Sequence, residues 1–217
     1  MTIPFVVELL EATDLHRAEL ESVPILRQML DGQCSRHEYI KFLSDLYHVV
    51  RHFCPIMGAA VSRCPDQFRQ LRSHLYGAMQ DEQGHEEMVL DDLAVFDVDI
   101  DRVRNSRLAG PVLALVSSNY HLADRGHPCS VIGMLYVLEL ISSAYAGSIA
   151  VGLARGFGMQ PEAGFSFLQS HASLDEMHVV RLHALLNTIN DEQAQQQVIE
   201  ATNSNFYLFK EWIRQIA

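Results

Sequence analysis

The sequence predicts an all-α protein that folds as a single helical domain. Apolar residues recur every three to four positions through most of its 217 residues, and no series of alternating apolar and polar residues predicts a sheet. Hydrophobic residues make up 48% of the chain, which is enough to build one sizeable core. No internal repeat, low-complexity tract or long linker divides the chain. We therefore expect one bundle of about seven helices over residues 1–217.

The first helices are separated by prolines. An N-terminal amphipathic helix is expected to end before Pro24. The next helix covers residues 35–63, where Ser35 and Glu38 have the spacing of a capping box. Pro55 should kink this helix, because proline removes a backbone donor and clashes with the preceding turn.

The rest of the chain predicts five further helices. One covers residues 65–96, with Pro65 suited to its first turn. Residues 97–107 are charged and lack periodicity, which predicts a loop before a shorter helix over 109–124. Residues 128–158 are apolar on nearly every side and should form a central helix. Two helices, over 164–189 and 191–216, complete the bundle.

Charge and cysteine usage argue against several classes of protein. The formal net charge of −11 disfavours a nucleic-acid partner and a polybasic membrane anchor. No segment is expected to reach the apolar length of a transmembrane helix, and the N-terminal residues lack the basic region of a signal peptide. The cysteines are scattered without a CxxC pair, which predicts reduced thiols and a cytoplasmic protein. These cysteines are Cys34, Cys54, Cys64 and Cys129.

The stretch HASLDEMH places two imidazoles and a carboxylate on one helix face. His171, Asp175 and His178 fall within about 60° of one another at 100° per residue. Leu182 shares this face, so we expect the face to point inward. Buried polar groups need partners, and a divalent metal ion would satisfy all three at once. From this motif alone, a solvated or hydrogen-bonded face is an equally good interpretation.

Two further segments carry metal-competent residues. In EQGH, Glu82 and His85 are three residues apart and should be neighbours on one helix face, as in carboxylate-bridged di-iron bundles. Glu139 lies in the middle of the most apolar helix, where an ionised carboxylate must be paired or bind a cation. A buried, hydrogen-bonded glutamate is the alternative. The acidic residues after EQGH are most simply a solvated face: Glu86, Glu87, Asp91 and Asp92.

Together the three segments supply three carboxylates and three imidazoles. Such a set suits two iron or manganese ions, with oxygen ligands bridging and nitrogen ligands terminal. The absence of cysteine from the set argues against an iron–sulfur cluster or a structural zinc site. The predicted metal ligands are Glu82, His85, Glu139, His171, Asp175 and His178.

The order of these motifs resembles the haem-oxygenase-like di-iron oxidases, the UndA- and CADD-like proteins of the haem-oxygenase fold. The resemblance implies that Glu82, His85 and His171 hold one iron ion, and that Asp175 and His178 hold the other. Glu139 would be shared or close to both ions. Some members place the first carboxylate one turn further from the histidine, where this chain has Ala78, and Glu82 is assigned that role here.

The resemblance also implies an activity. The protein would be a non-haem di-iron oxidase or oxygenase with two Fe(II) ions, Mn being an alternative, and with dioxygen as co-substrate. Its partner would be a small organic molecule, and a homodimer is common for this fold.

The same fold allows two other functions. A metal-free enzyme similar to the TenA or PqqC proteins would keep its activity after chelation. However, the stretch IGMLYVLE lacks the cysteine nucleophile of TenA proteins, and Cys129, which lies upstream of it, is not expected to replace that nucleophile. A haem-binding or haem-degrading protein would use His16, which follows a segment resembling the start of true haem oxygenases.

Overall fold

The predicted all-α class is confirmed. The computed structural model of the chain describes residues 3–108, 110–160 and 162–216, except for the side chains of residues 173–176. Every regular element in these ranges is helical. The elements run from α1 to α13 rather than through about seven helices, because several predicted segments are interrupted by a turn.

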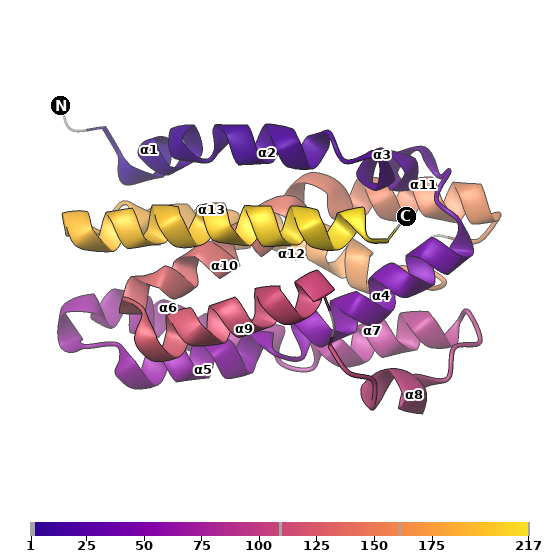
Figure 1. Cartoon of the computed structure of the whole chain (residues 1–217), viewed down its shortest axis with the longest axis horizontal. Coiled ribbons are helices and arrows are strands. Elements are labelled where there is room, and N and C mark those ends of the chain that lie inside the picture. The colour runs from indigo at the N-terminus through magenta and orange to yellow at the C-terminus, as the bar shows by residue number, and fades with distance from the viewer. Residues whose placement is uncertain (1–2, 109, 161, 217) are drawn as a thin grey trace.

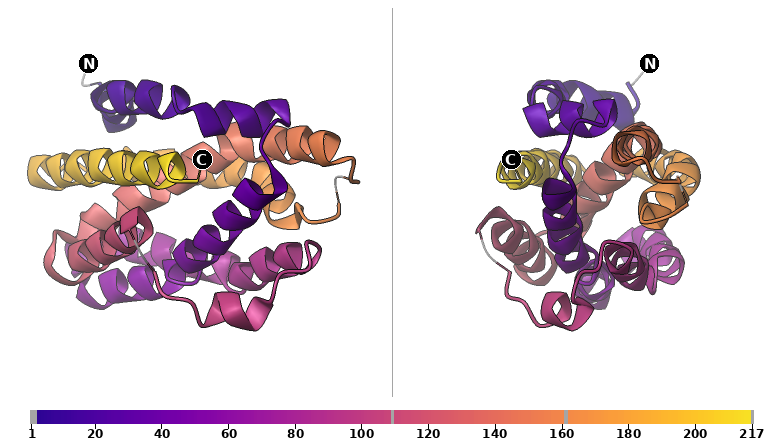
Figure 2. Two further views of the ribbon diagram at one scale, coloured as in Figure 1. Left: turned by 45° about the vertical axis from the view of Figure 1, so that its right-hand side comes forward. Right: turned by 90° about the vertical axis from the view of Figure 1, so that its right-hand side faces the viewer.

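The N-terminal and C-terminal helices lie side by side, although the two termini are far apart along the long axis (Figure 1). The helices α1 (Phe5–Ala12) and α2 (Asp14–Glu21) run beside α13 (Glu192–Arg214), which spans most of the long axis. The end-on view in Figure 2 shows the other helices arranged around a common interior. On the opposite side of the molecule in Figure 1 lie, among others, α5 (Phe53–Arg63), α6 (Arg69–Glu82) and α9 (Gly110–Arg125).

The predicted signals at the first helix boundaries are confirmed. Pro24 is the first residue of α3 (Pro24–Asp31). Ser35 and Glu38 form a reciprocal capping box at the start of α4 (Arg36–Val50). The predicted single helix over 35–63, kinked at Pro55, is wrong. The chain turns after Val50, and Pro55 lies in the first turn of the separate helix α5, where an amide N–H would have no helical partner.

Two predictions for residues 65–107 are wrong. The predicted helix over 65–96 is broken between α6 and α7 (His85–Ala94) by Gly84, whose φ of +89° does not occur within an α-helix. The predicted loop contains the short helix α8 (Ile100–Arg104). Asp99 caps this helix by accepting a 3.0 Å hydrogen bond from the backbone N–H of Arg102.

The predicted central helix is buried and contains an irregular turn. The helix α10 (Val131–Ile141) packs against α13 so closely that a Cβ on Gly133 would lie 2.6 Å from the backbone nitrogen of Thr202. A π-helical turn, Ser142–Ala146, follows and leads into α11 (Gly147–Phe157). Such π-helical turns are frequent at functional sites, and this one begins three residues after Glu139.

The stretch Pro128–Phe157 is long and apolar enough to cross a membrane, judged by length and composition alone. The expectation that no segment reaches this length is therefore wrong. Of its most apolar 18-residue window, 44% is buried inside the protein. Core helices pass the same test, and α10 contacts α9, α12 and α13.

The helix α12 (Ser166–Leu186) packs against the π-helical turn and α11. Small residues in that turn and at the start of α11 permit the close approach. A Cβ on Gly147 would lie 3.1 Å from the Cβ of Ala172 in α12. This packing brings the histidines of α12 next to the end of α10.

Candidate metal centre

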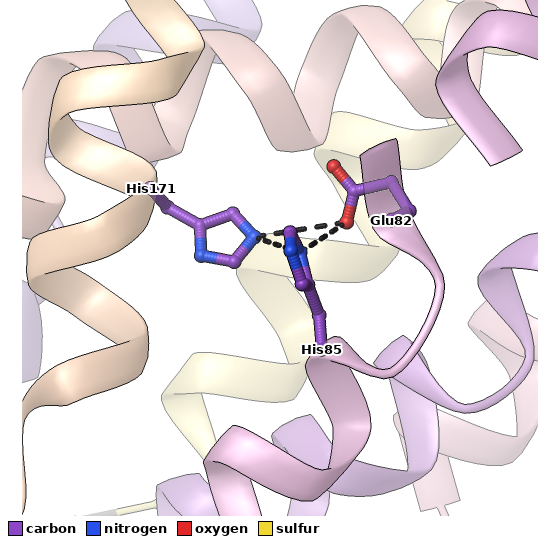
Figure 3. A group of neighbouring side chains, drawn as sticks. All are labelled: Glu82, His85 and His171. Atoms are coloured by element: carbon purple, nitrogen blue, oxygen red, sulfur yellow. Dashed lines mark hydrogen bonds and ion pairs between the residues drawn. The ribbon is translucent and has the colours of Figure 1, made fainter. Parts of the chain in front are cut away.

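Three of the six predicted ligands converge on one point (Figure 3). The Oε2 atom of Glu82 lies 3.0 Å from Nδ1 of His85 and 3.7 Å from Nε2 of His171. The two imidazole nitrogens lie 3.1 Å apart. All three potential ligand atoms lie within 4.8 Å of one another, and the side chains come from α6, α7 and α12.

A turn, and not one continuous helix, brings Glu82 and His85 together. Glu82 is the last residue of α6 and His85 is the first residue of α7. The prediction that the pair shares one helix face is therefore wrong, although the predicted proximity is confirmed. Gly84 supplies the positive φ of the turn between them.

The ring of His171 is held in one orientation. Its Nδ1 donates a 2.8 Å hydrogen bond to the carbonyl of Phe167, and the Phe167 ring stacks on it at 3.9 Å between centroids. With Nδ1 bound to this carbonyl, Nε2 is the ring nitrogen that faces Glu82 and His85. Such a second hydrogen bond commonly fixes the tautomer and orientation of metal-binding histidines.

Glu82 is buried and ionised. Its side chain is 8% exposed, and burial alone would raise the pKa of this carboxyl. The hydrogen bonds and charges of His171 and His85 outweigh that effect and bring the pKa of Glu82 to about 2. At neutral pH a buried carboxylate therefore faces two imidazoles.

The donor set fits a divalent iron ion. Donors bound about 2.1 Å from one ion, at angles near 90–110°, lie about 3.0–3.4 Å apart. Two of the three separations between these donor atoms, 3.0 and 3.1 Å, lie within this range, and the third, 3.7 Å, is slightly longer. Two imidazoles and one carboxylate are also the set that non-haem Fe(II) oxygenases use, because they leave coordination positions open.

Asp92 joins two of the helices that carry these ligands. It lies seven residues after His85 in α7 and accepts hydrogen bonds from the backbone N–H groups of Ser166 and Phe167, at 2.8 and 2.9 Å. These groups begin α12. Asp92 is 2% exposed, so its predicted place on a solvated face is wrong. Burial raises the pKa of Asp92, and the two N–H donors oppose this effect.

Glu139 and Glu82 line the same two cavities. The first cavity has mainly aliphatic and aromatic lining residues, and His171 also lines it. The second is polar, and His178 also lines it. The side chains of Glu139, His171 and His178 are 6%, 6% and 9% exposed, which confirms that these predicted ligands point inward.

The side chain of Asp175 lies outside the described residues, so its predicted role stays a prediction. Its two partners in the HASLDEMH motif are described, and they line different cavities. His171 faces the apolar cavity and His178 faces the polar one. The motif therefore extends from one cavity to the other, past Glu82 and Glu139, the two carboxylates that line both.

Three titratable residues that line the polar cavity were missed from the sequence: His74 and Asp81 of α6, and Arg181 of α12. His74 and Asp81 are seven residues apart, which is the spacing of one helix face. That spacing is the available signal. It is weak, because it also occurs on solvated helices.

The residues of the two alternative functions lie elsewhere. His16 is in α2 with Nδ1 3.7 Å from Glu19, and it is not among the described residues that line either cavity. Cys129 lines a third cavity, near Leu71 and Leu185. Burial raises the pKa of its thiol to about 12, which keeps the thiol protonated at neutral pH.

The chain belongs to the family of iron-containing redox enzymes, whose model matches residues 40–206. None of the curated proteins matches the chain. The resemblance to the haem-oxygenase fold is confirmed by solved structures, which at these low identities show the fold alone.

Three of these structures illustrate the range. A domain of unknown function with a haem-oxygenase-like fold from Shewanella denitrificans is 18% identical, with a TM-score of 0.87 over 100% of this chain and 93% of that chain. A TenA homologue from Pseudomonas syringae is 14% identical, with a TM-score of 0.82 over 98% and 92%. Haem oxygenase-1 from Synechocystis, in complex with haem, is 13% identical, with a TM-score of 0.75 over 98% and 91%.

Proposed function

We propose that this iron-containing redox enzyme is a non-haem di-iron oxidase or oxygenase acting on a small organic substrate. The observation that carries the proposal is a set of two imidazoles and one carboxylate, of which Glu82 and His171 are buried and line an apolar cavity. Iron bound there would supply the redox chemistry with dioxygen.

Two groups of residues, which share the region around Glu82 and Glu139, would each hold one ion. Glu82, His85 and His171 already have the mutual distances of ligands to one ion. For the other ion we propose His178, Asp175 and Glu139, with Glu139 close to both because it lines both cavities. Two adjacent buried carboxylates repel one another, and bound cations would offset that repulsion.

The apolar cavity supports a substrate with an apolar body. Its walls include Phe42, Leu46 and Phe209, which would exclude water from the reacting group. Ser142 and Tyr145 of the π-helical turn add hydroxyl-bearing side chains to this wall. A substrate in the cavity would lie against Glu82, Glu139 and His171, so its oxidised position would be set by how far its apolar part fills the cavity.

Metal analysis tests the proposal directly. The metal-free protein would be loaded anaerobically with Fe(II), freed of excess ion, and measured for bound iron and for absorption changes on exposure to dioxygen. We expect about two iron ions per chain and an oxygen-dependent change. His171→Ala should lose one ion. Iron well below one per chain, with no response to dioxygen, would overturn the proposal.

Two further measurements separate the alternative functions. An activity that survives chelation and is insensitive to Asp175→Ala would indicate a metal-free enzyme of the TenA or PqqC type. A Soret shift on addition of haem, lost in His16→Ala, would indicate a haem-binding protein.

A further inference from the structure

The polar cavity holds a carboxylate that the predicted ligand set does not include. Asp81 lines this cavity with His178 and Arg181, next to the two shared carboxylates. Its Oδ2 atom lies 3.5 Å from Nε2 of His178 and 3.4 Å from Nη1 of Arg181. Asp81 is thus placed between a histidine of the candidate centre and the half-exposed guanidinium of Arg181.

The distance between Asp81 and His178 is that of two ligands of one ion. Their 3.5 Å separation falls between the 3.0 and 3.7 Å separations found among Glu82, His85 and His171. A pair of donors about 2.1 Å from an ion, at an angle of about 110°, would be about 3.4 Å apart. Asp81 also faces Nε2, the outermost nitrogen of the ring, so both donors point to the same part of the cavity.

The α6 backbone explains why the cavity has room for an ion. Gly77 and Ala78, one turn before Asp81, line the cavity without a long side chain. His74 lies a further turn back, and its buried Nε2 has no hydrogen-bond partner among the described residues. A buried imidazole nitrogen in this position is normally satisfied by water or an ion.

We propose that Asp81 is a ligand of the second metal ion, together with His178, and that Arg181 neutralises Asp81 when this ion is not bound. The proposal rests on the proposed function, because it needs a second ion. In the metal-bound protein the guanidinium of Arg181 would repel the ion that replaces it on Asp81. Arg181 would therefore lower the affinity of the second site for its ion. The first site is built from Glu82, His85 and His171, so its affinity would not depend on Asp81.

Anaerobic titration of the metal-free protein with Co(II) tests this assignment. Bound metal would be counted per chain, and visible absorption would follow the coordination of each ion. The variants are Asp81→Asn, Asp81→Glu and Arg181→Gln. Asp91→Asn is the matched control, because Asp91 is an exposed aspartate of α7 that lines neither cavity.

We expect two ions in the wild type and in Asp91→Asn. Asp81→Asn should keep the first ion and bind the second about tenfold or more weakly, with altered absorption. Asp81→Glu should recover part of the affinity, and Arg181→Gln should bind the second ion more tightly than the wild type.

Two results would overturn the assignment, and they differ in what they say about the proposed function. Two ions with unchanged affinities in Asp81→Asn would remove Asp81 from the ligand set and leave the di-iron proposal intact. One ion in the wild type would refute both. If Asp81→Asn fails to fold, as judged by its thermal unfolding, an unchanged second affinity in Arg181→Gln decides against the proposal.

Discussion

Replacing Asp92 with alanine would test whether α7 holds α12 in place. The substitution removes the acceptor of two backbone hydrogen bonds, from Ser166 and Phe167, at a position that is 2% exposed. Both amides belong to the first turn of α12, where the helix offers them no partner of its own. After the substitution they would lie unpaired against a small apolar side chain.

The magnitude follows from these two bonds. A hydrogen bond to a charged group contributes about 1.5–3 kcal/mol, and removing both would cost about 3–6 kcal/mol. Burial of the carboxylate carries a cost of its own, as the raised pKa of Asp92 indicates. The substitution removes this cost, and its removal offsets part of the loss. We expect a net loss of about 2–4 kcal/mol in the free energy of unfolding, which lowers Tm by about 5–12 °C.

Urea unfolding at neutral pH, with and without Co(II), measures both consequences. His171 lies one turn into α12, so loss of the contact should also weaken the first metal site. Asp92→Asn keeps one acceptor oxygen and should lose about half as much stability as Asp92→Ala. Asp91→Ala is the control, since an exposed position should change stability by no more than about 0.5 kcal/mol. If Asp92→Ala costs no more than Asp91→Ala, the reasoning is refuted.

Three other predictions concern the turn, the apolar cavity and the metal. Gly84→Ala should lower the free energy of unfolding in urea by about 1–2 kcal/mol, because a Cβ there meets no neighbour and only the positive φ opposes it. Because the turn positions His85, Co(II) should also bind more weakly to this variant. An unchanged stability would contradict this. Val50→Phe should fill the apolar cavity and reduce binding of a fluorescent apolar probe without changing Co(II) affinity. The control is Val7→Phe, at a position that does not line the two cavities, and it should leave both probe binding and Co(II) affinity unchanged. Chelation of the iron-loaded protein should lower Tm by about 5–10 °C if the ion is present at about 100 times its Kd, and this difference should shrink in His171→Ala. A Tm that does not respond to chelation would show that iron does not stabilise the fold.

Helix boundaries could be predicted where the signal is local. The capping box at Ser35 and Glu38 satisfies backbone groups within four residues, so its spacing predicts the start of α4 directly. Gly84 gave no comparable signal. A single glycine inside a helical pattern is usually tolerated, and only the structure shows that this one adopts φ of +89°.

The candidate site could be predicted in part for a similar reason. Glu139 is identifiable because a carboxylate in an apolar helix violates the hydrophobic pattern. Asp92 and Asp81 lie in polar surroundings in the sequence, so the pattern does not distinguish them from solvated residues. Their roles depend on which helix packs against α6 and α7. That partner is α12, whose contacting residues lie 74 (Asp92 to Ser166) and 97 (Asp81 to His178) positions further along the chain.

The placement of Glu82 and Glu139 gives the two cavities different physical roles. A divalent ion that crossed the apolar cavity would lose its hydration before it met a ligand, and burying an unpaired charge costs many kcal/mol. The polar cavity offers Asp81 and His178 along the way, so hydration can be exchanged for protein ligands step by step. An apolar substrate has the opposite preference, since its transfer to the aliphatic cavity is favourable and its transfer to the polar one is not. In the proposed enzyme, ions and substrate would therefore approach the same two carboxylates from opposite sides, and substrate binding would leave the ligands of the second ion in place.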